Sequence, residues 1–95
     1  MAYNTKKIGD ALQELIKEYQ LNHKLNEVKL VNLWPVVVGD LINRHTTKIW
    51  VNGETLFVRI NSATLKHELS LSKSIVIQNI NKEMGMDIIK ELNIG

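Results

Sequence analysis

Residues 46–61 read TTKIWVNGETLFVRIN, and this stretch predicts a β-hairpin. Asn52-Gly53 is the turn signal, because a two-residue type I′ turn needs positive φ at both central positions and these two residue types tolerate it. A loop of Asn52 and Gly53 sets the register of the two strands. The predicted pairs are Val51 with Glu54, Trp50 with Thr55, Ile49 with Leu56 and Lys48 with Phe57.

Side chains alternate between the faces of a strand, so the predicted hairpin has one apolar face and one mixed face. The apolar face, which we expect in the core, holds Thr47, Ile49, Val51, Leu56, Val58 and Ile60. The opposite face carries Lys48, Trp50, Phe57 and Arg59. Because bases stack on aromatic rings and phosphates pair with cations, these four are the candidate nucleic-acid-binding residues. The alternative is that a helix or a partner protein covers the two rings.

Composition places the chain among ordinary globular domains. Its 95 residues are enough for one core, so residues 1–95 are predicted to form a single domain. The net charge of +2 permits an acidic partner without requiring one. There is no cysteine, no apolar run long enough to span a membrane and no signal peptide, so we expect a cytoplasmic protein without a membrane partner.

Two helical stretches are predicted before the hairpin. The first begins at Asn4 or Thr5, has apolar residues at helical spacing and ends near Gln20, followed by a short connection over 21–24. The second covers about 25–44, and Pro35 is expected to bend or break it. Within it, Trp34 is predicted to be a core anchor, Gly39 to mark a close backbone approach, and His45 to cap the end or pack.

One helix and one strand are predicted after the hairpin. The helix starts at Asn61 or Ser62 and ends at Gly85, which suits a left-handed C′ position. Residues 86–94 fit either more helix or a strand; we choose a strand, because a two-stranded hairpin needs a third strand for stability. The predicted class is α+β in the order α-α-β-β-α-β, with a three-stranded sheet and helices packed on one face.

The chain contains no recognisable catalytic motif. It lacks a glycine-rich phosphate loop, its three histidines are not at metal-ligand spacing, and no two carboxylates can be paired for acid–base chemistry. It also lacks the Gly-x-x-Gly clamp of RNA-binding KH domains. We therefore predict a protein that is not an enzyme, with no catalytic residue, metal, cofactor or small-molecule substrate.

A series of short motifs resembles the DciA-like family across nearly the whole chain. These motifs are WPVVVG at 34–39, RHT at 44–46, NGETLFV at 52–58, Asn61-Ser62 and Glu68-Leu69. The resemblance implies a KH-like fold and a role in loading the bacterial replicative helicase at DNA, without an ATPase of its own. Longer members carry a flexible tail beyond this domain, and this chain stops at Gly95.

The function expected from the resemblance is that of a DNA-replication accessory protein. Its expected partners are single-stranded or forked DNA and the replicative helicase. Two alternatives stay open: a protein–protein adaptor that uses Trp50 and Phe57 as its partner patch, and an RNA-binding KH-like module. Salt dependence separates the DNA-binding function from the adaptor function, because phosphate binding weakens steeply with salt.

Overall fold

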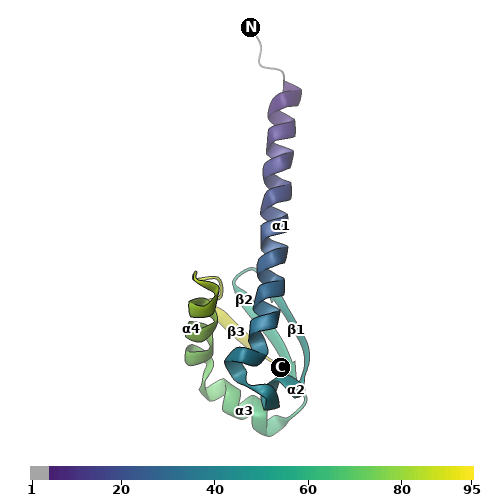
Figure 1. The fold of residues 1–95 in the computed structure, drawn as a ribbon. Helices are drawn as coiled ribbons and strands as arrows, with labels where there is room; N and C mark the ends of the chain where they lie inside the picture. Colours follow the sequence, from purple (N-terminus) through teal and green to yellow (C-terminus); the bar gives the residue numbers. More distant parts are fainter. Residues whose placement is uncertain (1–4) are drawn as a thin grey trace.

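The computed structural model describes residues 5–95, with side chains from residue 8 onward, and shows an α+β fold with four helices and a three-stranded sheet (Figure 1). The elements in chain order are α1 (Thr5–Val38), α2 (Asp40–Arg44), β1 (Thr46–Asn52), β2 (Thr55–Ile60), α3 (Ala63–Leu71), α4 (Lys73–Met84) and β3 (Glu91–Ile94). The predicted fold class is confirmed, and so is the strand after Gly85. The alternative cap Asn4 lies outside the described residues.

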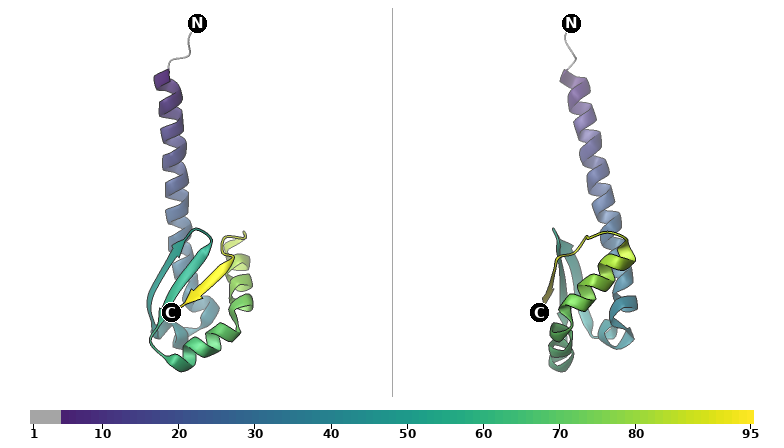
Figure 2. Two further views of the ribbon diagram at one scale, coloured as in Figure 1. Left: turned by 180° about the vertical axis from the view of Figure 1, so that it is seen from behind. Right: turned by 90° about the vertical axis from the view of Figure 1, so that its left-hand side faces the viewer.

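The sheet has the order β1-β2-β3, with β1 antiparallel and β3 parallel to β2. The helices lie on one face of the sheet, and in the left view of Figure 2 the other face turns toward the viewer without a helix in front of it. This arrangement confirms the prediction that the helices pack on one side. A helix over Trp50 and Phe57, one of the two alternatives for their outer face, is not found among residues 5–95.

Helix α1 is longer than the sequence suggested, since it runs unbroken through residues 21–24, where we expected a connection. Those four residues include neither Gly nor Pro, so nothing in them ends a helix. Tyr19 and His23 even stack edge to face one turn apart, with ring centroids 5.2 Å apart. The prediction of two separate helices before residue 35 was therefore wrong.

The break after α1 falls at Gly39 and not at Pro35. Pro35 removes one of the last hydrogen bonds of the helix, and burial of Leu30 and Trp34 holds the segment helical around it. Gly39 has φ +90°, a conformation that residues with a Cβ rarely adopt. Apart from Gly39 itself and its two chain neighbours, no atom of the described residues lies within 4 Å of the position a Cβ would take, so the predicted close backbone approach is wrong. The glycine is required for its backbone angle.

The hairpin forms, but its register is offset by two residues from the prediction. Asn52 pairs with Thr55 and Trp50 with Phe57, so the two-residue loop is Gly53-Glu54. Gly53 has φ +62° and no non-glycine residue among residues 5–95 has positive φ, which is the pattern of a type II′ turn. An offset of two keeps each side chain on its face, which is why the two predicted faces survive.

An irregularity near the start of β1 moves one residue off the predicted apolar face. The pairing shifts between Thr46 and Lys48, which leaves Thr47 as the extra residue of a β-bulge. Thr47 is exposed, and Thr46 takes the inward position instead. The prediction that Thr47 lies in the core was therefore wrong, whereas Ile49 and Val51 pack against the core as expected.

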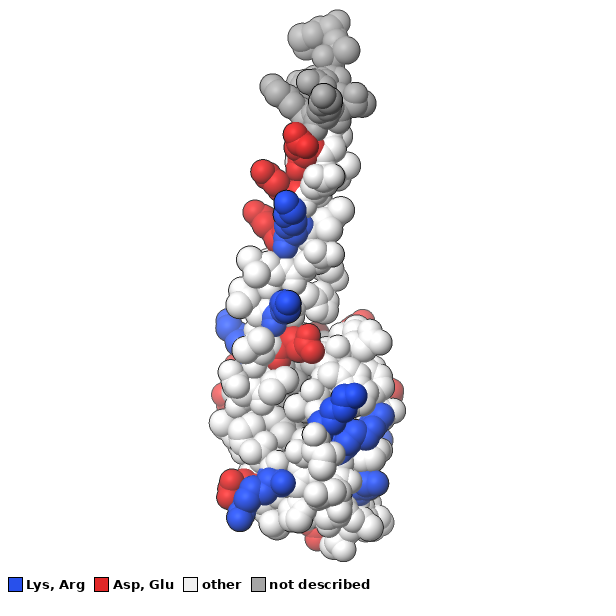
Figure 3. Space-filling model, turned by 90° about the vertical axis from the view of Figure 1, so that its right-hand side faces the viewer, with Lys and Arg blue, Asp and Glu red and all other residues white. Residues whose placement is uncertain are grey.

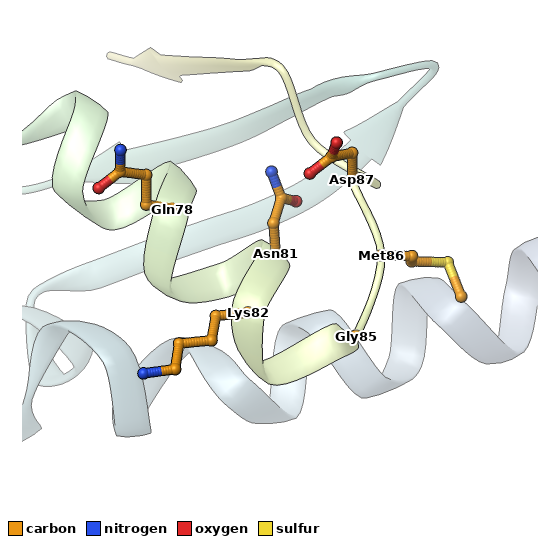
Figure 4. Close-up of a pocket in the computed structure, with 6 residues that line it drawn as sticks. All are labelled: Gln78, Asn81, Lys82, Gly85, Met86 and Asp87. Atoms are coloured by element: carbon orange, nitrogen blue, oxygen red, sulfur yellow. The ribbon is translucent and has the colours of Figure 1, made fainter.

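The predicted helix from Ser62 to Gly85 is two helices separated at Ser72. Ser62 caps α3, its Oγ accepting from the backbone N–H of Leu65 at 3.3 Å, and Gly85 ends α4 with φ +75°. Asn81 then fixes the turn toward β3: its Nδ2 donates to Ile89 O at 2.8 Å. Its Oδ1 accepts from the N–H groups of Ile88 and Ile89 at 3.1 and 3.0 Å. Figure 4 shows Asn81 between α4 and this turn, at the edge of an open depression.

The core lies between the sheet and the helices, and Trp34 is its largest fully buried side chain. Its indole Nε1 donates to Thr46 Oγ1 at 2.9 Å, and that hydroxyl donates to Ile42 O at 2.7 Å. The predicted core anchor is confirmed. His45 caps α2, as predicted, and its Nδ1 lies 2.7 Å from Asn61 Oδ1 at the base of the hairpin.

Candidate nucleic-acid interface

The uncovered face of the sheet brings the four predicted site residues together. Trp50 lies directly opposite Phe57, and Lys48 directly opposite Arg59. Sequence reasoning placed Trp50 diagonal to Phe57, so the contact is closer than expected because of the two-residue offset. We call these four residues the sheet-face cluster.

The two rings of the cluster form a parallel stack. Their centroids are 5.1 Å apart and their planes differ by 4°, and both side chains are half-buried. Lys48 Nζ lies 4.7 Å and Arg59 Cζ 4.8 Å from the Trp50 ring centroid, within the range of cation–π attraction. Trp50 is therefore the centre of the cluster and contacts its other three members.

Two cations directly opposite each other on neighbouring strands destabilise a sheet. Lys48 and Arg59 are paired in this way, and neither forms an ion pair with a carboxylate in the part of the chain that the structure describes. The ion pairs there join Arg44 to Asp40 and Lys90 to Glu54. The Trp50 ring offsets part of this repulsion.

Asn93 is a member of this surface that sequence reasoning missed. Its Oδ1 accepts from Arg59 Nη1 at 3.1 Å, and the same nitrogen donates to Val58 O at 3.0 Å. Asn93 reaches Arg59 because β3 pairs parallel with β2, which places Asn93 beside Phe57. No local sequence signal could have revealed a contact between residues 34 apart.

Charge is unevenly distributed over one face of the described part of the molecule. Figure 3 shows several acidic side chains along the upper part of α1 and a patch of basic side chains on the globular part below. On the face drawn there, the basic patch is the surface that an anionic ligand meets with the least repulsion.

Other kinds of site have little support in residues 8–95. No group of three or more His, Asp or Glu side chains there is arranged to hold a metal ion. The depression beside Asn81, about 470 Å³, is open to solvent, and the polar atoms of Asn81 are already engaged by the backbone. No helix among the described residues has the length and apolar character needed to cross a bilayer.

Comparison with known proteins identifies the family. No curated protein sequence matches this chain. A family model described as "Dna[CI] antecedent, DciA" matches residues 7–94 and so covers all seven helices and strands except the first two residues of α1. This family consists of proteins that load the replicative helicase during bacterial DNA replication. The chain therefore belongs to the DciA family of helicase loaders.

Proposed function

We propose that this protein is a non-enzymatic replication accessory that binds single-stranded or forked DNA through the sheet-face cluster while it assists loading of the replicative helicase. The observation that supports the proposal best is the pair of opposed cations over a stacked Trp, on a sheet face that no helix of residues 5–95 covers. Family membership supports the helicase role.

The cluster suggests how a DNA strand binds. In the free protein, the cationic groups of Lys48 and Arg59 lie over the Trp50 ring. A backbone phosphate attracts both cations, and their movement toward it uncovers the ring for a base. Phosphate pairing and base stacking are therefore coupled, since the first makes room for the second.

The test is binding of a fluorescent single-stranded oligonucleotide, measured by anisotropy over a range of salt concentrations. Trp50→Ala is expected to weaken binding by about 1–3 kcal/mol at every salt concentration, because a stacking platform is lost. Lys48→Ala/Arg59→Ala is expected to lower the log–log salt slope by about 1.4, since two phosphate contacts are removed. Lys73→Ala/Lys82→Ala removes the same charge from exposed positions on α4 and is the matched control.

Two results would contradict the DNA face. The first is equal affinity of the wild type and a folded quadruple variant of Lys48, Trp50, Phe57 and Arg59. The second is an equal loss of salt dependence in the α4 control, which would show that only overall charge matters. Circular dichroism of each variant distinguishes lost binding from lost folding.

The same variants test the other functions. If they lose capture of the replicative helicase but the wild type binds no DNA, the cluster is a protein-docking patch and the adaptor function holds. If RNA of the same sequence displaces the DNA at lower concentration, the ligand is RNA. Purified protein is expected to hydrolyse no ATP, and turnover that follows the protein through two unrelated purification steps would contradict the non-enzymatic role.

A further inference from the structure

The N-terminal half of α1 carries an apolar stripe that no other described part of the chain covers. Its members Ile8, Leu12, Leu15, Ile16 and Tyr19 are between 52 and 66% exposed. They recur at steps of three and four residues, so they share one side of the helix. In Figure 1 this half of α1 projects beyond the rest of the domain.

The stripe is an extension of the face that α1 uses in its own core. Steps of three and four residues lead from Tyr19 through His23 and Asn26 to Leu30 and Trp34, which are fully buried. The side of the helix that packs against the domain thus continues outward as an exposed surface. Solvated helices normally show polar residues there.

The exposed area is large enough for a stable interface. The protein exposes 6954 Å². A compact monomer of 10.9 kDa exposes roughly 5,600 Å². The surplus of about 1,400 Å² is spread over all sides of the projecting helix. A partner can cover only one side, roughly 700 Å², which falls within the roughly 600–1,000 Å² that each partner buries in an interface of standard size.

Charge and shape favour an identical helix as the partner. Residues 5–20 contain three lysines and three acidic residues, so two such segments have no net repulsion and no attraction to a charged partner. The N-terminal end of the stripe is flanked by the small residues Gly9 and Ala11, and its other end by the longer side chain of Glu18. Antiparallel pairing sets each small end against a bulky end, which allows the helices to approach closely.

We propose that two copies of this chain dimerise through the N-terminal halves of α1, packed antiparallel. Ile8 then faces the partner subunit's Tyr19, and Leu12 faces the partner subunit's Leu15. The pairing is isologous, as a two-fold axis requires. The two globular parts lie at opposite ends of the helix pair, so they do not collide, and both sheet faces stay open. The proposal is independent of DNA binding.

The first experiment measures the mass of the full chain by sedimentation over a range of concentrations. The wild type is expected at twice 10.9 kDa. Leu15→Glu is expected to weaken the dimer by more than about tenfold, because each dimer then buries two unpaired carboxylates. Leu21→Glu is the matched control: Leu21 is 59% exposed against 61% for Leu15, but it lies off the stripe on the same helix. Leu and Glu have similar helix propensity, so both variants stay helical.

The second experiment tests the antiparallel direction, using the absence of native cysteine. Chains carrying Ile8→Cys mixed with chains carrying Tyr19→Cys are expected to form disulfide-linked heterodimers under oxidation, and each variant alone to stay uncrosslinked. Strong self-crosslinking of either variant would show that the two helices pack parallel and not antiparallel. A monomeric wild type up to about 1 mM, or a dimer unaffected by Leu15→Glu, would overturn the proposal. A monomer whose helicase capture is lost in Leu15→Glu would overturn it too and assign the stripe to the helicase.

Discussion

At the scale of single residues, Trp34 and Thr46 form the polar link within the core. The indole Nε1 of Trp34 donates to the Thr46 hydroxyl, which donates to Ile42 O, and so ties α1 to the start of β1 and the end of α2. Because the bulge moves Thr47 outward, Thr46 is the threonine that meets the tryptophan. Both polar groups lose water on folding, so each depends on the other.

Truncation of Trp34 is expected to be the most costly single change in the core. Trp34→Ala should lower the free energy of unfolding by about 3–5 kcal/mol, since a fully buried aromatic side chain leaves a cavity. Thr46→Val should cost about 1–3 kcal/mol, because the indole N–H loses its acceptor. Urea denaturation measures both values. A double variant Trp34→Phe/Thr46→Val tests the link, since it should lose less stability than the two single variants lose together. If the two losses simply add, the hydrogen bond between Trp34 and Thr46 contributes nothing.

At the scale of elements, the two turns that end helices depend on different chemistry. Gly39 separates α1 from α2 by a backbone angle that only glycine adopts easily, whereas the α4–β3 turn is held by the side chain of Asn81. The first turn directs the chain from the long helix toward β1. The second places β3 beside β2 and therefore Asn93 beside Arg59.

Gly39→Ala is expected to lower the free energy of unfolding by about 1–3 kcal/mol, because φ +90° is strained for alanine although the space is open. Val36→Ala, at a 70% exposed position in the same turn of helix, should change stability by less than about 0.5 kcal/mol. Thermal or urea denaturation compares the two. Equal stability of Gly39→Ala and Val36→Ala would show that the backbone relaxes at residue 39.

Asn81→Ala is expected to cost about 1–3 kcal/mol, since two backbone N–H groups lose their acceptor near the core. Asn81→Asp keeps the acceptor and loses only the donor to Ile89 O, so its cost should be smaller. The order of the two variants in urea denaturation is the test. If aspartate is the worse substitution, the backbone carbonyl and not the N–H groups determines the turn.

At the scale of the whole molecule, the projecting helix dominates the shape. The radius of gyration is 17.8 Å and the longest extent 67 Å, against roughly 12 Å for a compact domain of this length. The monomeric variant Leu15→Glu should therefore scatter X-rays as an elongated particle with a radius near 18 Å. A radius near 13 Å would mean that the helix folds back on the domain, which would also remove the surface proposed for dimerisation.

Much of this protein follows from local sequence alone. The alternation of apolar and mixed residues in 46–61 determined both strand faces except at Thr47, and the serine and glycine signals located the start of α3 and the end of α4. The four residues of the sheet-face cluster were therefore predictable, because a period of two assigns faces without knowledge of the register. Trp34 was predictable as a core residue because its neighbours follow helical spacing.

Tertiary structure decided the features that depend on contacts between distant residues. The hairpin register was set by Gly53 taking the positive φ, so Trp50 lies opposite Phe57, and the bulge at Thr47 shifts the pairing only beyond Lys48. The continuity of α1 through Pro35 depended on burial of Leu30 and Trp34 against the sheet. The contact of Asn93 with Arg59 required the parallel β3. At the hairpin and at Pro35 the local preferences are of the order of 1–3 kcal/mol, and packing of the assembled core outweighs them.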